Sequence, residues 1–186
     1  MKRTISILSF VICASLTAQS TWKSDKAHSK VGFAITHLMI SEVEGHFGEF
    51  DITAVADDSF AEPKFTVDIQ TASIETRNDR RNEHLRSADF FDAETYPSIS
   101  FQTTSFEKTG EKTFKLTGDL TMHGVTRPVT LEGKLNGIIT DQRSKKLKAG
   151  LKLTGTVNRL EFKVGGDTPT LGDEVDMTIN LEMAQQ

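Results

Sequence analysis

The chain has 186 residues, 37% of them hydrophobic and 26% charged, and a formal net charge of −4. This length fits one domain, and an acidic chain without a basic block is a poor nucleic-acid binder. The single cysteine, Cys13, excludes an internal disulfide and any zinc site built on several cysteines.

The first segment has the pattern of an export signal. A short positive start precedes an apolar run over residues 5–16, and small residues follow it. That run is shorter than the ~20 residues that a spanning helix needs. We therefore predict a cleaved signal peptide over residues 1–20, with cleavage after Ala18 or Ser20. The cysteine leaves with it, so the single domain expected over residues 21–186 has no thiol nucleophile.

Most of that domain alternates apolar and polar residues with a period of two, which is typical of half-buried strands. The alternating segments are 31–35, 43–54, 65–69, 99–103, 114–122, 129–135, 147–157 and 175–183. The second segment contains a slip at Gly48-Glu49, which predicts a β-bulge. Short polar turns between later segments favour antiparallel neighbours.

One interval, residues 73–97, breaks this rhythm. Asn78 can cap a short helix that runs to about Arg86, and Asp92 can cap a second short turn. The sequence therefore predicts an all-β fold, an eight-stranded antiparallel barrel with a short helical insertion near residues 78–95. Closure removes the edge strands, which favours the barrel. The alternative is an open β-sandwich.

The pattern leaves open whether the barrel is hollow. The chain has twelve Phe but one Trp and one Tyr. Small residues stand in the inward phase of the strands: Gly45, Gly118, Gly133, Ala149 and Gly155. In one interpretation they leave room for a cavity lined by Phe, which could hold one small ligand. In the other, the glycines only relieve the bending of the barrel.

Five histidines raise the question of a metal site, but none occurs in an HxH or HExxH arrangement. We predict that no metal binds. A nucleophile-elbow motif and glycine-rich phosphate motifs are also missing from the sequence. No nucleophile, base and orienting group are brought together by the sequence, so we expect no catalytic residue and no cofactor.

The helical insertion combines basic and apolar side chains. They are Arg77, Arg80, Arg81, His84 and Arg86, beside Leu85, Phe90 and Phe91. Interleaved acidic residues would explain a solvated helix with surface ion pairs. An exposed polar helix does not require two adjacent phenylalanines, however, and their apolar rings must pack somewhere. They therefore favour a lid across a barrel opening. Both interpretations stand at this point.

Several motifs resemble the YceI-like family of exported lipid-binding proteins. They run from Trp22 through His28-Ser29 to Phe33, then HLRSADFFD at 84–92, Tyr96-Pro97, residues 118–126, and Asn158-Arg159 with Phe162. The central HLRSADFFD stretch is the most specific of these. The motifs follow one another in the family's order, and the resemblance covers essentially all of residues 21–186.

The resemblance implies a lipocalin-like barrel that holds a long-chain amphiphile, such as an isoprenoid quinone or a polyprenyl phosphate, as its ligand. It implies a periplasmic or secreted protein that is not an enzyme. Transient membrane contact and a homodimer are further expectations, whereas nucleic acid is not expected as a partner. The candidate residues of the cavity and its mouth are Phe33, His37, Phe47, Phe65, His84, Leu85, Arg86, Phe90, Phe91, Phe101, Gly118, Leu120, His123 and Phe162.

Two rival functions use the same scaffold. In the first, the protein is an enzyme that acts on the head of a captured lipid, with His84 or His123 as the base. In the second, it is a stress-response module whose barrel is filled by its own side chains.

Overall fold

The computed structural model describes residues 18–186, so residues 1–17 of the expected signal peptide lie outside the described residues. The strands are β1 (Ser20–Ser24), β2 (Lys30–His37), β3 (Ser41–Phe47), β4 (Phe50–Ala56), β5 (Lys64–Gln70), β6 (Ile74–Glu75), β7 (Ser98–Lys108), β8 (Thr113–Met122), β9 (Val125–Thr140), β10 (Leu147–Asn158) and β11 (Leu171–Gln185). The helical elements are η1 (Thr71–Ser73), α1 (Asp79–Arg86) and η2 (Arg159–Phe162). Among the described residues, no helix has the length and apolar character to cross a membrane.

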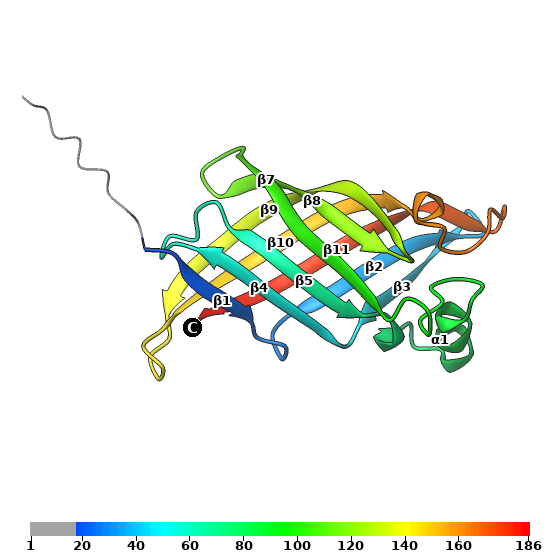
Figure 1. Cartoon of the computed structure of the whole chain (residues 1–186), viewed down its shortest axis with the longest axis horizontal. Helices are drawn as coiled ribbons and strands as arrows, with labels where there is room; N and C mark the ends of the chain where they lie inside the picture. Colours follow the sequence, from blue (N-terminus) through cyan, green and yellow to red (C-terminus); the bar gives the residue numbers. More distant parts are fainter. Residues whose placement is uncertain (1–17) are drawn as a thin grey trace, which may run out of the picture.

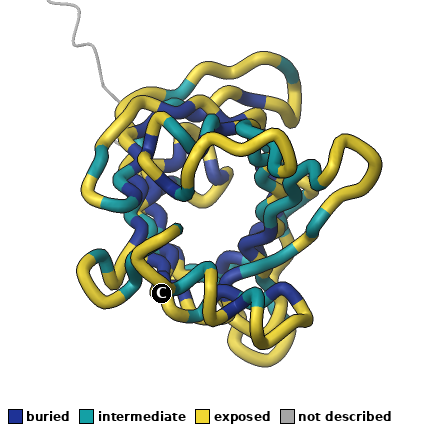
Figure 2. Tube along the Cα trace, turned by 90° about the vertical axis from the view of Figure 1, so that its right-hand side faces the viewer, coloured by how far each residue is buried: buried dark blue, intermediate teal, exposed yellow. Residues whose placement is uncertain are grey.

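The strands form one closed barrel, drawn along its length in Figure 1 and end-on in Figure 2. β1 and β2 both pair with β11 and together make one wall strand, and β3 and β4 make the next. Antiparallel pairing then runs in chain order through β5, β7, β8, β9 and β10 to β11. The pairing of β1 with β11 closes the ring. The barrel therefore has eight wall strands, as predicted, and the open sandwich is excluded.

The slip at Gly48-Glu49 marks the point where one wall strand changes partners. Before it β3 pairs with β2, and after it β4 pairs with β1 and β5. The freed backbone is satisfied elsewhere, because the amide of Gly48 donates to the carbonyl of Ser73 at 3.0 Å. The break thus lets one continuous wall strand pair with β2 in its first half and with β1 and β5 in its second half.

Besides the two-residue β6, β1 is the strand that the alternation did not reveal. Its five residues include one large apolar side chain, Trp22, which is fully buried. A single apolar residue in so short a segment gives no period-two signal. Its place in the barrel comes from pairing with β4 and β11, which are distant in the sequence.

The helix forms where the sequence places it. The side chain of Asn78 accepts a hydrogen bond from the amide of Arg81 at 3.0 Å, which caps the first turn of α1. Asn82 on the buried face ties the helix to the chain before it. Its Oδ1 accepts from the amide and the hydroxyl of Thr76 at 2.8 and 2.7 Å. The expected second turn follows, with the amide of Tyr96 donating to the carbonyl of Asp92.

One end of the barrel is filled by its own side chains. The rings of Trp22 and Phe60 meet edge to face at 4.9 Å, and both side chains are buried. Phe60 lies in the β4–β5 loop, which Asp57 organises. The Asp57 carboxylate accepts from the hydroxyl of Ser59 at 2.7 Å and from the amide of Ala61 at 3.0 Å. A carboxylate at the surface therefore holds the ring that closes this end.

We call Trp22 and Phe60 the plug of this end of the barrel. The hydrogen bonds of Asp57 make the stability of the plug depend on pH. The Ser59 hydroxyl, with the amides of Ala61 and Ser59, lowers the pKa of Asp57 below its usual 3.8. A carboxyl whose folded pKa is lowered stabilises the fold above about pH 4 and loses that contribution as the pH falls through the folded pKa. In thermal melts, Asp57→Asn should therefore be less stable than the wild type near neutral pH, and the difference should shrink in acid. Asp119→Asn, on the surface of β8, is the control, and a difference independent of pH would contradict the assignment.

Candidate binding cavity and its mouth

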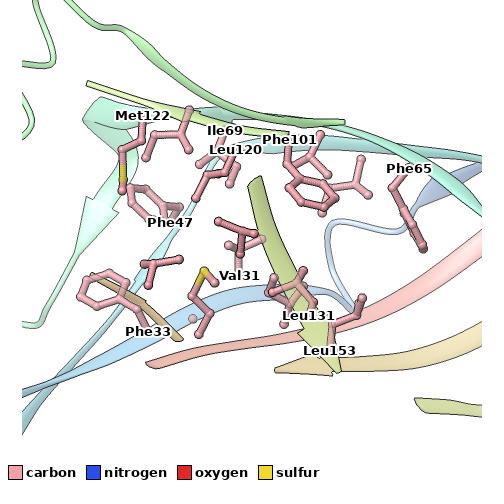
Figure 3. Close-up of a pocket in the computed structure, with 18 of the residues that line it drawn as sticks. Val31, Phe33, Phe47, Phe65, Ile69, Phe101, Leu120, Met122, Leu131 and Leu153 are labelled. Atoms are coloured by element: carbon pink, nitrogen blue, oxygen red, sulfur yellow. The ribbon is translucent and has the colours of Figure 1, made fainter. Parts of the chain in front are cut away.

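The middle of the barrel encloses a cavity of about 120 Å³ (Figure 3). Its lining consists of apolar side chains and one glycine: Val31, Gly32, Phe33, Phe47, Ile52, Phe65, Val67, Ile69, Ile99, Phe101, Leu116, Leu120, Met122, Val129, Leu131, Leu153, Val157, Met177, Ile179 and Leu181. These residues come from every wall strand, because alternate side chains of each strand point inward. The lining therefore offers apolar contact and no titratable side chain.

Glycines on the inward face keep the aromatic rings close to the wall. A Cβ atom built on Gly45 would lie 2.3 Å from the ring of Phe33, and one on Gly118 would lie 2.3 Å from the ring of Phe101. Gly133 stands in the same relation to Phe114, at 2.1 Å. The space left by the glycines is thus occupied by rings that lie across neighbouring strands. Because the rings lie against the wall, the centre of the barrel stays open, which supports the hollow interpretation.

The cavity is less closed at the end opposite the Trp22 plug. Along β11 the inward residues Val175 and Met177 are half-buried, whereas Leu181 and Met183 are 5% and 0% exposed. Val175 pairs with Ile35 near the end of β2. The half-buried residues thus lie toward the β2–β3 turn, at the end of the barrel that also carries α1 (Figure 1). We take this end as the mouth.

The segment after α1 packs over this mouth. The ring of Phe91 meets that of Phe47 at 6.0 Å, and Phe47 in turn lies 5.8 Å from Phe33 inside the cavity. Phe90 lies against Gly165 in the loop before β11, where an added Cβ would come 2.7 Å from the ring. The described contacts favour the lid interpretation over a freely solvated helix.

Arg86 holds the lid in place. Its Nε donates to the carbonyl of Ala72 at 2.7 Å, and its Nη2 donates to the carbonyl of Ile74 at 3.1 Å. Two N–H groups of the guanidinium therefore donate hydrogen bonds to backbone carbonyls of η1 and β6. This geometry is a pin between the helix and the barrel, and the partners are carbonyls rather than the neighbouring acidic residues.

His84 and His123 lie at the same end in different surroundings. His84 is exposed, 3.3 Å from the carboxylate of Asp89, and its ring packs on Phe90 at 4.9 Å. His123 occupies the two-residue β8–β9 turn, and its ring lies 4.6 Å from that of Tyr96. Among the described residues, His123 Nδ1 is the only buried side-chain nitrogen or oxygen without a hydrogen-bond partner.

The structure divides the predicted site residues into three groups. The cavity lining contains Phe33, Phe47, Phe65, Phe101 and Leu120. Residues of the mouth and lid are His37 at the end of β2, His84, Leu85, Arg86, Phe90, Phe91 and His123. The remaining two are structural: Gly118 lies under the ring of Phe101, and Phe162 in η2 is 1% exposed and absent from the lining.

The lining also contains residues that the sequence prediction did not name. They are Val31, Gly32, Ile52, Val67, Ile69, Ile99, Leu116, Met122, Val129, Leu131, Leu153, Val157, Met177, Ile179 and Leu181. The period-two alternation identifies most of them as inward-facing. It does not separate residues around the cavity from those that fill the plug, because both groups are apolar and share one phase.

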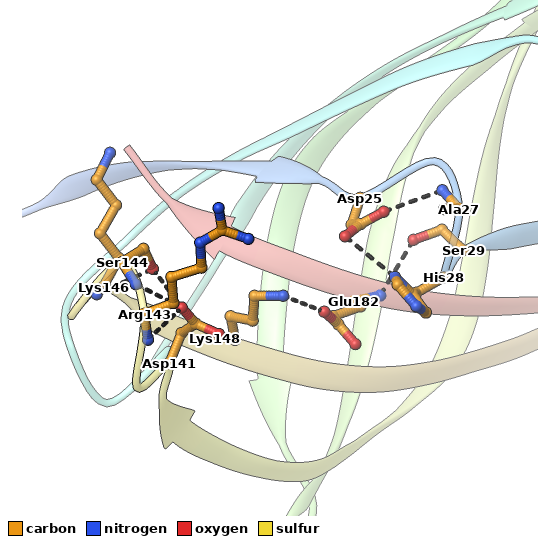
Figure 4. Close-up of polar contacts among 10 residues, drawn as sticks. All are labelled: Asp25, Ala27, His28, Ser29, Asp141, Arg143, Ser144, Lys146, Lys148 and Glu182. Atoms are coloured by element: carbon orange, nitrogen blue, oxygen red, sulfur yellow. Dashed lines mark hydrogen bonds and ion pairs between the residues drawn. The ribbon is translucent and has the colours of Figure 1, made fainter.

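Another polar cluster lies away from the mouth, at the break between β1 and β2 (Figure 4). The ligand atoms of Asp25, His28 and Glu182 come within 4.8 Å of one another. The imidazole of His28, 3.1 Å away, lowers the pKa of Asp25. Lys148 Nζ lies 2.7 Å from Glu182, and this contact raises the pKa of the lysine. An ammonium group thus already neutralises the carboxylate that a metal would need.

An eight-stranded antiparallel barrel that is plugged at one end, with an apolar cavity and a short helix at the other, defines a lipocalin-like β-barrel protein. Within this class the chain belongs to the YceI-like family, because the YceI-like domain matches residues 22–183. The chain is 38% identical over 185 residues to Protein YceI of Escherichia coli O6:H1, covering 98% of this chain and 96% of that one. It is 36% identical to a UPF0312 protein of Pseudomonas putida, covering 100% and 99%.

Solved structures show the same barrel. The Campylobacter jejuni YceI protein superposes with a TM-score of 0.76 and 36% identity, covering 87% of this chain and 96% of that chain. BcnA of Burkholderia cenocepacia gives a TM-score of 0.77 at 26% identity, covering 86% and 98%. A polyisoprenoid-binding domain from Saccharophagus degradans gives 0.67 at 12% identity, covering 89% and 98%, a likeness of fold.

Proposed function

We propose that this protein binds a long-chain isoprenoid amphiphile in its barrel and carries it through an aqueous compartment. The observation that carries this proposal is the uniformly apolar lining of the cavity, which extends over all eight wall strands. An apolar tail in water gains about 25 cal/mol for each Å² of its surface that is buried. Such a lining offers a polar ligand no hydrogen bonds, so it selects for hydrocarbon.

The enclosed part of the cavity has the length of a short tail. On β8 the lining runs from Leu116 to Met122, which at ~3.3 Å per residue and ~40° of strand tilt is about 15 Å along the barrel axis. An isoprene unit has four chain bonds, or about 5 Å if three bonds between Cα atoms span 3.8 Å. A tail of three units, whose ~15 carbons are worth about 12 kcal/mol when buried, matches this length. The open volume of about 120 Å³ is close to the ~150 Å³ of a cavity that binds one benzene ring, so the lining side chains must move apart to admit such a tail. A longer tail would leave through the mouth.

A structural neighbour supports the choice of ligand. A domain with the same fold is described as polyisoprenoid-binding, and this chain has the barrel and the apolar interior that such a tail requires. The expected signal peptide supports a periplasmic or secreted location, where a shielded lipid would have to cross water. The quinone or phosphate head group would remain at the mouth.

We further propose that the protein acts by binding alone. The cavity lining has no side chain that could act as acid, base or nucleophile. His84 is exposed on the helix and paired with Asp89. The proposal includes no cofactor apart from the bound lipid.

The test is organic extraction of freshly purified protein, followed by lipid mass spectrometry. We expect an isoprenoid amphiphile in near-stoichiometric amount. Chemically unchanged lipid after prolonged incubation would agree with binding without catalysis, whereas turnover would favour the enzyme. Recovery of no lipid from several expression hosts would contradict the proposal and favour a barrel filled by side chains.

The mouth residues give a prediction about head-group selection. Because Arg86 already donates to two backbone carbonyls, Arg86→Ala should weaken a polyprenyl phosphate and a neutral polyprenol of equal length alike, and lower the melting temperature. His123→Leu removes the unpaired nitrogen and should weaken a ligand with a polar head while leaving a hydrocarbon of equal length unaffected.

Titration of these ligands against both variants separates the two roles. A selective loss of the phosphate ligand in Arg86→Ala would reject the pinning role and show that the guanidinium selects the head group. An equal loss of polar and apolar ligands in His123→Leu would reject the head-group role of His123.

A further inference from the structure

The β2–β3 turn carries an exposed apolar tip, residues 38–40. Leu38, Met39 and Ile40 are 50%, 79% and 85% exposed. The other large exposed hydrophobic residues in the described part of the chain, Val55 and Ile139, lie on separate strands. Solitary exposed apolar residues need no explanation, but three in succession at the end of a hairpin do.

The backbone of this tip is unfavourable for the residues it carries. Leu38 and Met39 have φ values of 52° and 60°, and the amide of Ile40 donates to the carbonyl of His37 at 3.3 Å. Positive φ at both central residues is the pattern of a type I′ turn, which strongly favours Asn-Gly. The β8–β9 turn follows the usual rule, with Gly124 at its second position. The tip thus holds two large apolar side chains in a conformation that suits them poorly, which points to a role outside the fold.

The position of the tip connects it with the cavity. His37, at its base, pairs with Leu171, and the next inward residues along β2 and β11 are the half-buried residues of the mouth. The Trp22 plug closes the opposite end. An apolar ligand that enters or leaves the cavity therefore passes close to Leu38, Met39 and Ile40.

We propose that residues 38–40 insert into the surface of a lipid bilayer and so place the barrel mouth against its apolar interior; the inference rests on the proposed lipid-binding function. A stable protein interface uses about 20–30 residues on each side, and a convex tip of three residues cannot supply that. A bilayer accepts such a tip, because its apolar side chains can enter the boundary between head groups and acyl chains. Docking in this way would let a tail pass between two apolar phases without crossing water.

The charges near the tip indicate whether docking requires anionic or neutral lipids. The first charged residues after it, Glu42 and Glu44, are acidic, and Glu44 faces the guanidinium of Arg77 at 3.9 Å. Attraction to anionic lipids requires clustered Lys and Arg. Binding should therefore occur on neutral phosphatidylcholine vesicles and change little with salt.

The first experiment measures docking without any isoprenoid. The purified protein is floated with phosphatidylcholine vesicles and compared with the double variant Leu38→Asn, Met39→Gly. We expect the variant to lose at least tenfold in vesicle binding. Its melting temperature should stay the same or rise, because Asn-Gly suits a type I′ turn. Ile139→Ser, near the β9–β10 loop at the plugged end, should bind vesicles like the wild type. All three proteins share the same N-terminus, so its contribution cancels.

The second experiment measures transfer of a polyprenol between vesicles. The double variant should carry as much extracted lipid as the wild type but exchange it at least tenfold more slowly. Equal vesicle binding by wild type and double variant would overturn the docking proposal. So would sedimentation that shows a wild-type dimer and a variant monomer, because the tip would then contact a second copy. Protein that docks on vesicles but contains no isoprenoid would instead refute the proposed function and leave the docking role intact.

Discussion

Replacing Arg159, a buried residue of η2, with Ala should produce a large loss of stability. The side chain is 3% exposed, and its Nε donates to the carbonyl of Gly172 at 2.8 Å. Its Nη1 donates to the carbonyls of Val164 and Gly166 at 3.0 and 2.9 Å. Loss of these charge-assisted bonds, one of them to the carbonyl of the buried Val164, should cost about 3–4 kcal/mol. For a chain of this size the melting temperature should fall by about 10 °C.

Two matched variants sharpen the test. Arg159→Lys retains the charge but lacks the planar fork that reaches several carbonyls at once, so it should recover only part of the loss. Arg143→Ala in the exposed β9–β10 loop should change stability by less than ~0.5 kcal/mol. A melting temperature for Arg159→Ala within 2 °C of the wild type would show that the loop before β11 does not depend on this guanidinium.

Narrowing the cavity from two walls should reduce ligand binding about thirtyfold. Val67 on β5 and Ile179 on β11 both line the cavity, and changing both to Phe adds seven carbons to its interior. At ~0.3 kcal/mol for each displaced ligand atom, the loss is about 2 kcal/mol. Retained lipid and the affinity for a fluorescent polyprenyl analogue would measure it.

The neighbouring outward positions provide the control. Asp68 and Asn180 are exposed residues on the same two strands, so the double variant Asp68→Phe, Asn180→Phe adds the same rings outside the barrel. It should keep the wild-type ligand content and affinity. If the inward and outward pairs bind ligand equally well, the cavity is not the binding site.

Much of the barrel could be predicted from local pattern alone. The alternation in segments such as 147–157 requires one buried and one solvated face, and the structure confirms it in β10. Asn78 identified the start of α1 because an N-cap depends on a few adjacent residues. The role of the two ends of the chain in closing the barrel could not be predicted from local pattern. Trp22 and Met183 contribute to the closure through pairing between β1 and β11, which lie at opposite ends of the sequence.

The site shows the same division. The Phe residues of the cavity wall were predicted because inward phase and apolar character are both visible in the sequence. The role of Arg86 was not, since its partners are the carbonyls of Ala72 and Ile74, which any residue type would provide. The glycines were ambiguous for a similar reason: only the register of paired strands shows that Gly45 lies opposite Phe33.

The sequence by itself therefore determined the class of fold, the strand segments, the helical insertion and the apolar character of the interior. These follow from residue periodicity and capping, which act over a few neighbouring positions. The tertiary structure alone decided which end is plugged by Trp22, which inward residues border the cavity, and that Leu38, Met39 and Ile40 stand beside its mouth. Those properties depend on the register and closure of strands far apart in the chain, and no local pattern encodes the distance between them.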